Sequence, residues 1–247
     1  MDNMVNNTMH RKLYEHVEEA IGVRIIKGEY QPSDTLPNEE ALCAEFGVSR
    51  GVIREAIKVL NKKGLVLPRP KIGTQIQPKT QWNLFDADIL VWKLKAGQQL
   101  GFLKKVTEVR RIIESEAAKL SAERASKEEY VEIQKLCKEL EDILNDEVRF
   151  NYEKYLQIDM AFHSAILEAS HNELLAQIGH TMRHAVQTAR QADIHNIAIL
   201  SASQPFHNAV MRAIARKDPE GAYSASREMF DQVWANLPEN HDSTSKN

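Results

Sequence analysis

Apolar residues recur at intervals of three and four along most of the chain beyond residue 80, which is the spacing of helices with one buried face. The stretch between Pro78 and Pro205 has no proline and few glycines, and it is rich in the good helix formers Ala, Leu, Glu, Lys and Gln. Its apolar stripes are Ile112, Ala117 and Leu120; Ile133, Leu136, Leu140, Ile143 and Leu144; and Leu156, Met160, Ile166 and Leu167. We predict six or seven packed helices.

Capping residues mark two helix starts in this part of the chain. Ser126 stands before three polar residues, two of them acidic, which is typical of a helix N-terminus. Asp218 precedes Pro219, and proline suits the first helical position because its missing N–H has no partner there anyway. The first eight residues and the tail 238–247 are expected to be disordered.

The first 80 residues follow a different pattern. A helix fits residues 10–27, before Gly28. PNEEALCAEF predicts a second helix capped by Asn38, GVS a tight turn, and RGVIREAIKVLNKK a third helix that Ser49 caps and Gly64 ends. LVLPRPKIGTQIQP gives two β-type runs around a tip of Pro, Gly and Lys. Three helices followed by a hairpin predict a winged helix-turn-helix.

These patterns predict two domains and a connector. Prolines cluster between residues 32 and 78, and the composition then becomes helical, so we place a boundary near residue 80. We expect the winged helix-turn-helix at 9–79, a linker and first helix at 80–96, and an all-α domain at 97–237. The fold class is therefore mainly α.

Charge is divided unevenly between these domains. The chain carries 32 basic and 35 acidic residues, a net charge of -3, which argues against a nucleic-acid partner. Residues 50–79, however, hold eight basic residues and one acidic residue, a balance of +7, whereas residues 80–247 carry -5. This asymmetry indicates that only the small module contacts something anionic.

Three basic residues share one face of the predicted third helix. Arg50, Arg54 and Lys58 are four residues apart, and the apolar residues of the segment lie on the opposite face. A DNA-reading helix needs this division, because it packs on its own domain and presents Arg to base edges in the major groove. The alternative is a solvated face on an ordinary amphipathic helix. The turn, the caps and the basic hairpin tip favour DNA reading.

LPNEEALCAEFGVSRGVIREAIKVLNKKGLV, followed by a wing with a glycine, resembles the N-terminal domain of GntR-type bacterial transcription regulators. The family usually has Arg where this chain has Glu40, so one common DNA contact is missing. The resemblance, together with the basic face, implies contacts with operator DNA by Arg50, Gly51, Arg54, Lys58, Lys71 and Gly73.

Two polar side chains lie one turn apart in IDMAFHSAI. Asp159 and His163 can share a divalent metal with an imidazole from another helix, and His207 leads a second apolar helix. The spacing also fits a hydrogen-bonded i,i+4 pair. Because Cys43 and Cys137 form no C-x-x-C pair, a disulfide scaffold and a cysteine-rich zinc site are excluded.

Residues 82–236 resemble the all-helical ligand-binding (FCD) domain of the FadR branch of these regulators, through EVRRIIE, D-x-x-x-H, A-S-x-N-x-L-L and F-H-x-A-V-x-x-A-I-x-x-x-D. The resemblance implies a divalent metal ion, zinc or similar, on Asp159, His163 and His207. The family's last histidine falls on Met229, and methionine is a poor ligand for hard divalent metals. Three side chains plus water or effector, a weak site, and an absent metal all stay open.

The same resemblance points to the residues that meet an acidic effector. Arg110 matches an arginine that commonly does so, and a guanidinium suits a carboxylate, although an ion pair with Glu114 explains this arginine equally well. We predict an effector site of Arg110, Glu114, His184 and Met229. His180 and His184 could also replace the missing metal ligand, although a polar surface role fits each.

The linker QWNLFDADILVWKL and the methionine in place of the last histidine resemble the sugar-acid regulators of this branch. We expect a homodimeric repressor that binds an inverted repeat in double-stranded operator DNA and is released by a small carboxylate such as an aldonate or hexuronate. One alternative is a sensor of acyl-CoA or another organic acid. Another is a metal-dependent hydrolase or lyase that uses Asp159, His163 and His207, but an enzyme leaves the basic winged module unexplained.

Composition and the lengths of apolar segments indicate the class of protein and where it is located. Hydrophobic residues make up 43% of the chain and charged residues 27%, which is typical of a globular protein. No apolar run approaches the roughly 20 residues that span a bilayer, and MDNMVNNTMH lacks the apolar core of a signal peptide. We expect a cytoplasmic protein without membrane contact.

Overall fold

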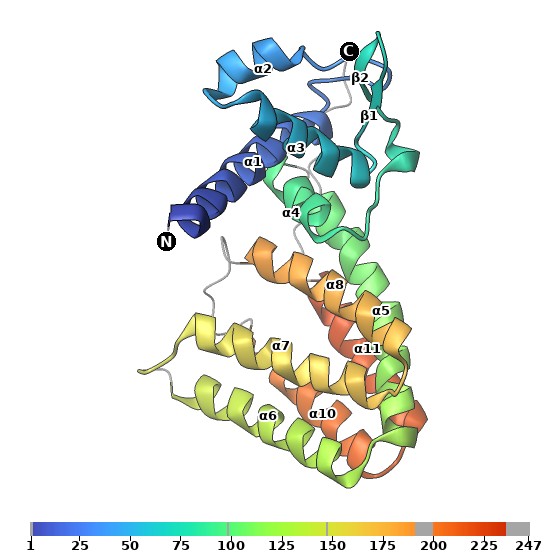
Figure 1. The fold of residues 1–247 in the computed structure, drawn as a ribbon. Helices are drawn as coiled ribbons and strands as arrows, with labels where there is room; N and C mark the ends of the chain where they lie inside the picture. The colour runs from blue at the N-terminus through green and yellow to red at the C-terminus, as the bar shows by residue number, and fades with distance from the viewer. Residues whose placement is uncertain (1, 98, 147, 191–199, 236–247) are drawn as a thin grey trace. The chain divides into compact units, whose positions relative to one another are not determined.

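The computed structural model describes residues 2–97, 99–146, 148–190 and 200–235. The chain divides into two compact units, residues 1–99 and 100–247, which we call the first and second unit (Figure 1). Among the described residues, no helix combines the length and the apolar character needed to cross a bilayer. The tail 238–247, for which we expected disorder, lies outside the described residues.

The first unit confirms the predicted winged helix-turn-helix. It contains α1 (Asp2–Lys27), α2 (Glu39–Phe46), α3 (Arg50–Lys62), β1 (Val66–Arg69), β2 (Gly73–Ile76), the 3-10 helix η1 (Lys79–Gln81) and α4 (Ala87–Lys95). The start of α1 at Asp2 contradicts the expected disorder of the first eight residues, since no proline or glycine interrupts the chain before Gly22. The segment 80–96 belongs to this unit.

The expected caps form the turn of the helix-turn-helix. Asn38 Oδ1 accepts a hydrogen bond of 2.8 Å from the backbone N–H of Ala41, and Ser49 caps α3. Gly47 adopts the left-handed conformation with φ 64° at the end of α2. The wing is antiparallel, and Arg69 on β1 lies opposite Gly73 on β2.

The linker helix α4 is attached to α1 and to the end of α3. A Cβ on Gly22 of α1 would lie 2.4 Å from the Trp92 ring, so only glycine admits this contact. Lys63, the residue after α3, donates hydrogen bonds of 2.8 Å to Asp86 and 2.5 Å to Asp88. These contacts make α4 part of the first unit.

A buried carboxyl group lies beside this lysine. Glu18 of α1 is 6% exposed, and its Oε2 has no hydrogen-bond partner in the described structure. Burial raises the pKa of Glu18 to about 7, because the attraction of Lys63 only partly offsets the loss of water and the repulsion of Asp88. The folded unit therefore retains a proton that an unfolded chain releases near pH 4.5.

We expect Glu18→Gln to stabilise the first unit at pH 8 and to leave its stability almost unchanged at pH 4. The stabilisation from the Glu18 proton is complete below the unfolded pKa and is lost as pH rises through the folded pKa, by about 3 kcal/mol at most. Urea unfolding at both pH values, followed by the fluorescence of the buried Trp82 and Trp92, measures it. An effect of equal size at both values contradicts this origin.

The second unit is helical throughout its described part. Its labelled helices are α5 (Gln99–Arg124, whose first residue falls in the first unit), α6 (Lys127–Asn145), α7 (Tyr152–Ala169), α8 (Glu173–Arg190), α10 (Gln204–Ala215) and α11 (Pro219–Ala235). Helix α6 packs on α7 and α10, α8 packs on α7, and α11 packs on α10. These helices confirm the mainly α fold.

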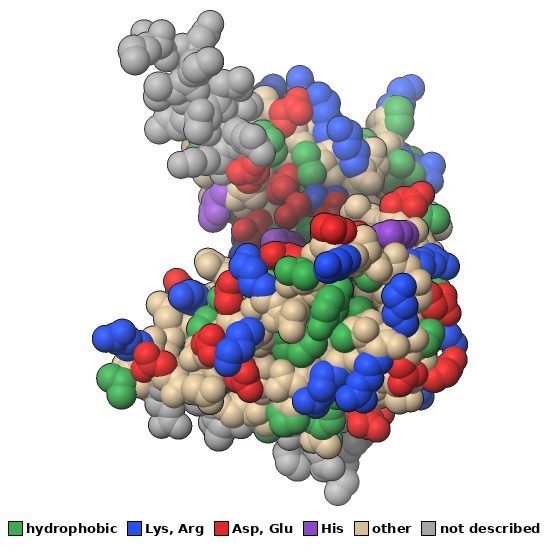
Figure 2. Space-filling model, turned by 90° about the horizontal axis from the view of Figure 1, so that it is seen from below, with side chains coloured by type: hydrophobic (Ala, Val, Ile, Leu, Met, Phe, Trp, Pro, Cys, Tyr) green, Lys and Arg blue, Asp and Glu red, His purple; other side chains and the backbone are tan. Residues whose placement is uncertain are grey.

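Caps and burial agree with most of the sequence pattern. Ser126 and Glu129 form a capping box at α6, and Asp218 accepts a hydrogen bond from the Gly221 N–H at the start of α11. Ile112, however, is 58% exposed, so its assignment to a buried stripe is wrong. Figure 2 shows basic and acidic side chains interspersed over one face of the molecule, which is typical of a solvated surface.

Candidate functional site

Helix α3 presents its predicted basic face to solvent. Arg50, Arg54 and Lys58 are exposed, whereas Val52 and Ile53 on the opposite face are buried against the first unit. The amphipathic pattern therefore places the three cations where an outside polyanion can reach them.

The three cations of this face differ in their partners. The Arg54 Nε donates to both carboxylate oxygens of Glu39 on α2, at 2.9 and 3.1 Å. Lys58 donates to Glu55 on its own helix at 2.7 Å. Arg50 has no ion pair within the described part of the chain, so its donors are available to a ligand.

The wing brings Lys71 to an exposed tip. Lys71 has a φ of 64°, and Gly73 has a φ of 110°, a left-handed conformation that favours glycine. A Cβ on Gly73 would lie 2.7 Å from the Thr35 Cγ2, so space and backbone both select glycine. The tip residues Lys71, Ile72 and Gly73 are all exposed.

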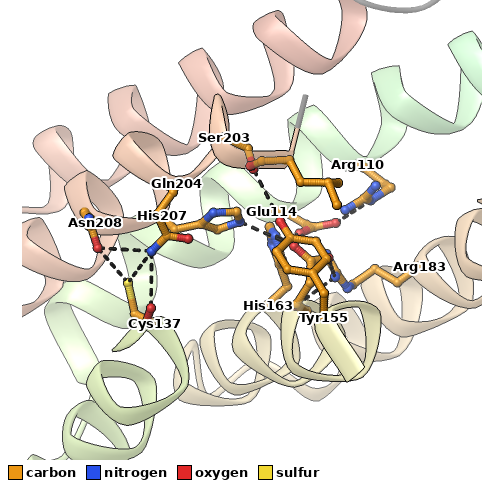
Figure 3. A network of polar contacts seen from close by, with 12 residues as sticks. Arg110, Glu114, Cys137, Tyr155, His163, Arg183, Ser203, Gln204, His207 and Asn208 are labelled. Carbon is orange, nitrogen blue, oxygen red and sulfur yellow. Dashed lines mark hydrogen bonds and ion pairs between the residues drawn. The ribbon is translucent and has the colours of Figure 1, made fainter. Parts of the chain in front are cut away.

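In the second unit, the predicted metal ligands come together from two helices (Figure 3). Asp159 and His163 lie on α7 and His207 lies on α10, and one ligand atom from each lies within 4.8 Å of the others. The Asp159 Oδ1 lies 3.7 Å from the His163 Nε2 and 3.5 Å from the His207 Nε2. We call these three residues the Asp-His-His cluster.

A second layer of charged side chains orients the cluster. The Glu114 Oε2 on α5 lies 2.7 Å from the His163 Nδ1, which directs the other ring nitrogen toward Asp159. Arg183 on α8 donates from Nη1 to Glu114 and from Nη2 to the Asp159 Oδ2, both at 3.1 Å. The two oxygens of Asp159 thus have separate roles, since Oδ2 is bound to Arg183 and Oδ1 faces the imidazoles. Such outer contacts commonly orient metal ligands.

Burial and the neighbouring charges set the protonation states. Burial alone would raise the pKa of Asp159, but His163, His207 and Arg183 hold it well below its usual value. Burial and the charge of Arg183 lower the pKa of His163 to about 4. At pH 7 the cluster therefore offers an ionised carboxylate and a neutral imidazole, which are the forms that bind metals.

The cluster also contains buried nitrogen atoms that make no hydrogen bond in the described structure. His207 is 2% exposed, and neither ring nitrogen makes a hydrogen bond in the described structure. A buried polar atom without a hydrogen bond is unusual in a folded protein, and a bound ion or water is a common explanation. The donor set of one carboxylate and two imidazoles suits zinc or a similar divalent ion.

Three of the four predicted effector residues lie on or beside the Arg110 side chain. The Arg110 Nε donates to the Glu114 Oε1 at 2.7 Å, so the intrahelical ion pair exists. The Arg110 guanidinium also lies over the Phe230 ring at 4.9 Å, and Met229 precedes that residue on α11 and is buried. The exposed His184 is not in the Asp-His-His cluster.

Two further outcomes concern the neighbouring helix α8. His180 lies 3.4 Å from the Ser164 Oγ and 3.7 Å from the Glu168 Oε1, and it is not in the Asp-His-His cluster. Arg183, which is not among the residues predicted from the sequence, is 1% exposed and joins α8 to α5 and α7. In the sequence, Arg183 could be noticed only as a basic residue that follows the apolar Met182 within a predicted helix.

Two family models match the chain. Residues 13–76 match the bacterial regulatory proteins of the gntR family, and residues 105–232 match the FCD domain. The uncharacterized HTH-type transcriptional regulator YieP of Escherichia coli is 32% identical over 86% of this chain and 90% of its own. The galactonate operon transcriptional repressor of the same organism is 30% identical over 89% of this chain and 94% of its own.

A solved structure shows the same fold. The protein is Lar, described as controlling expression of the Listeria monocytogenes agr system and mediating virulence. The match has a TM-score of 0.59 at 20% identity, and it covers 93% of this chain and 97% of the other.

Proposed function

Because the chain belongs to the gntR family of bacterial regulatory proteins and carries an FCD domain, it is a DNA-binding transcription regulator, and we propose that it is a repressor released by a small carboxylate. The family consists of transcription regulators and not enzymes, so the hydrolase or lyase alternative is set aside. The observation that carries the effector proposal is the Asp-His-His cluster in the FCD domain, which is linked to Arg183 directly and to Arg110 through Glu114.

The first unit supplies the DNA contacts in this proposal. Helix α3 enters the major groove with Arg50, Arg54 and Lys58, and the wing tip contacts the adjacent backbone with Lys71. The glycines at positions 51 and 73 allow close approach of the backbone. Two copies of the chain place two α3 helices on the halves of an inverted repeat, as a homodimer does.

The Asp-His-His cluster is the proposed metal site. Asp159, His163 and His207 would hold the ion, and Glu114 and Arg183 orient two of these ligands. A divalent cation there supplies a positive centre that a carboxylate and a neighbouring hydroxyl oxygen can chelate together. This chemistry favours a polyhydroxy acid.

Arg110 provides the anchor for the effector carboxylate. In the described part of the chain its hydrogen bond to Glu114 comes from Nε, so the two terminal amino groups suit a bidentate contact with an acid. A sugar acid such as an aldonate or hexuronate matches this polar site better than an acyl chain does. The similarity to a galactonate operon repressor supports the same class of effector.

Effector binding would act by shifting populations. An acid that binds more tightly to the form with low operator affinity lowers the fraction of protein on DNA by its difference in affinity for the two forms. In gel-shift titrations of the full chain with zinc present, at least one acid of an aldonate and hexuronate panel is expected to release the operator. Unchanged operator binding across the panel would count against this effector class.

We expect His207→Ala to weaken zinc binding by more than about 10-fold, because the variant leaves two protein ligands and even outer-layer changes cost 10–100-fold. Calorimetric titration of chelator-treated protein measures the affinity. His180→Ala is the matched control, since this histidine lies on α8 outside the cluster. Equal zinc affinity in the two variants would remove the cluster from consideration as the metal site.

A further inference from the structure

A carboxylate on α2 holds one arginine of the DNA-reading face. Glu39 is the first residue of α2, and both its oxygens accept from the Arg54 Nε. The Arg54 side chain is 63% exposed and that of Glu39 is 37% exposed. An exposed pair of this kind contributes only about 0–1 kcal/mol to stability. Its main effect is therefore on where the guanidinium points.

The helices that carry this pair are fixed relative to each other within the first unit. Leu42 of α2 and Ile53 of α3 are fully buried in the same core, and the turn between the helices is held by Gly47 and the Ser49 cap. Glu39 therefore presents its carboxylate to Arg54 from a rigid frame. Neither of the other two cations of this face is held across the helices in the described structure.

The contact decides which donors Arg54 can offer to DNA. With Nε engaged, the two terminal amino groups remain as a parallel pair, and a parallel pair fits the O6 and N7 acceptors of guanine end-on. Holding one long side chain before binding also saves about 0.5–1.5 kcal/mol of ordering free energy. The carboxylate repels phosphate oxygens, which disfavours contact of the same arginine with the DNA backbone.

We propose that Glu39 is a positioning residue that sets operator discrimination by orienting Arg54 toward a guanine. Its negative charge lowers the affinity for DNA of any sequence, while its hydrogen bonds to Arg54 favour operator DNA that has a guanine at the contacted position. The proposal rests on the role of α3 as the DNA-reading helix and extends it to a residue on the preceding helix.

The experiment compares Glu39→Ala with Glu40→Ala in the full chain. Glu40 is in the same turn of α2, is exposed and has no ion pair in the described structure, so its variant removes the same charge without releasing Arg54. The probes are a duplex that the unmodified protein selects from random-sequence DNA and a scrambled duplex of equal composition. Both dissociation constants are measured at several salt concentrations.

We expect both variants to bind the scrambled duplex more tightly than the unmodified protein does, because each lacks one negative charge. Only Glu39→Ala should lower the ratio of selected to scrambled affinity, by about tenfold, which is within the range of one Arg–guanine contact. Glu39→Gln should lose less, since its amide oxygen still accepts from Nε. Thermal melting should be nearly the same for all variants.

A double-variant cycle tests whether Glu39 acts through Arg54. Adding Glu39→Ala to Arg54→Ala should leave the discrimination ratio where Arg54→Ala puts it. Equal ratios for Glu39→Ala and Glu40→Ala, or a further loss in the double variant, would overturn the proposal. Failure of the unmodified protein to select any sequence would overturn sequence-specific reading itself, and the proposal with it.

Discussion

We expect replacement of both Arg50 and Arg54 by alanine to lower operator affinity by roughly 30-fold to 20,000-fold. Each good contact of an arginine with guanine contributes about 1–3 kcal/mol, and about 1.4 kcal/mol corresponds to tenfold in affinity. Both side chains are exposed on α3, so their loss removes DNA contacts without opening the core. Gel shifts at fixed salt measure the change.

A second pair of variants separates this effect from net charge. Lys135 and Lys138 are exposed on α6 of the second unit, and replacing both by alanine removes the same charge far along the sequence from α3. This control should keep operator affinity within a few-fold of the unmodified protein. Comparable losses from the two double variants would mean that α3 does not read the operator.

Arg183→Met is expected to destabilise the second unit by about 3–5 kcal/mol, the usual result of removing one partner of a buried ion pair. The methionine fills a similar volume but leaves Glu114 and Asp159 without the cation that each contacts at 3.1 Å. Two neighbouring carboxylates in a buried site then repel each other. Thermal and urea unfolding of the full chain, followed by circular dichroism, measure the loss.

The matched control for this prediction is Arg111→Met. Arg111 also forms an ion pair with a carboxylate, that of Asp231 at 2.8 Å, but both side chains are partly exposed. The expected loss of stability is therefore below about 1 kcal/mol. Added zinc should restore part of the stability of Arg183→Met, since it supplies positive charge next to Asp159. Equal losses of stability in the two variants would show that burial does not increase the contribution of the Arg183 ion pairs.

The winged helix-turn-helix could be predicted because its signals are local. Asn38 and Ser49 cap helices within three residues of their own positions, and Gly47 and Gly64 adopt positive φ where each helix ends. The Asp159 and His163 pair was also local, being one helical turn apart. For these features, sequence spacing and spatial distance express the same geometry.

The outer layer of the metal site could not be predicted in this way. Arg183 lies 24 residues from Asp159 and 69 from Glu114 along the chain, and only the packing of α5, α7 and α8 brings the three together. The i,i+4 spacing predicted Arg110 as the partner of Glu114 on its own helix, and the structure contains this pair. The sequence held no signal that Glu114 also contacts His163 and Arg183.

The charges of four ionised side chains in and around the Asp-His-His cluster cancel one another. Arg110 and Arg183 contribute two positive charges, and Glu114 and Asp159 contribute two negative ones, so the site is electroneutral before any ion enters. A divalent cation would leave this buried region with an excess of two positive charges, which is unfavourable away from water. A carboxylate effector reduces that excess. Cation and acid should therefore bind with positive cooperativity, each raising the affinity for the other by the same factor.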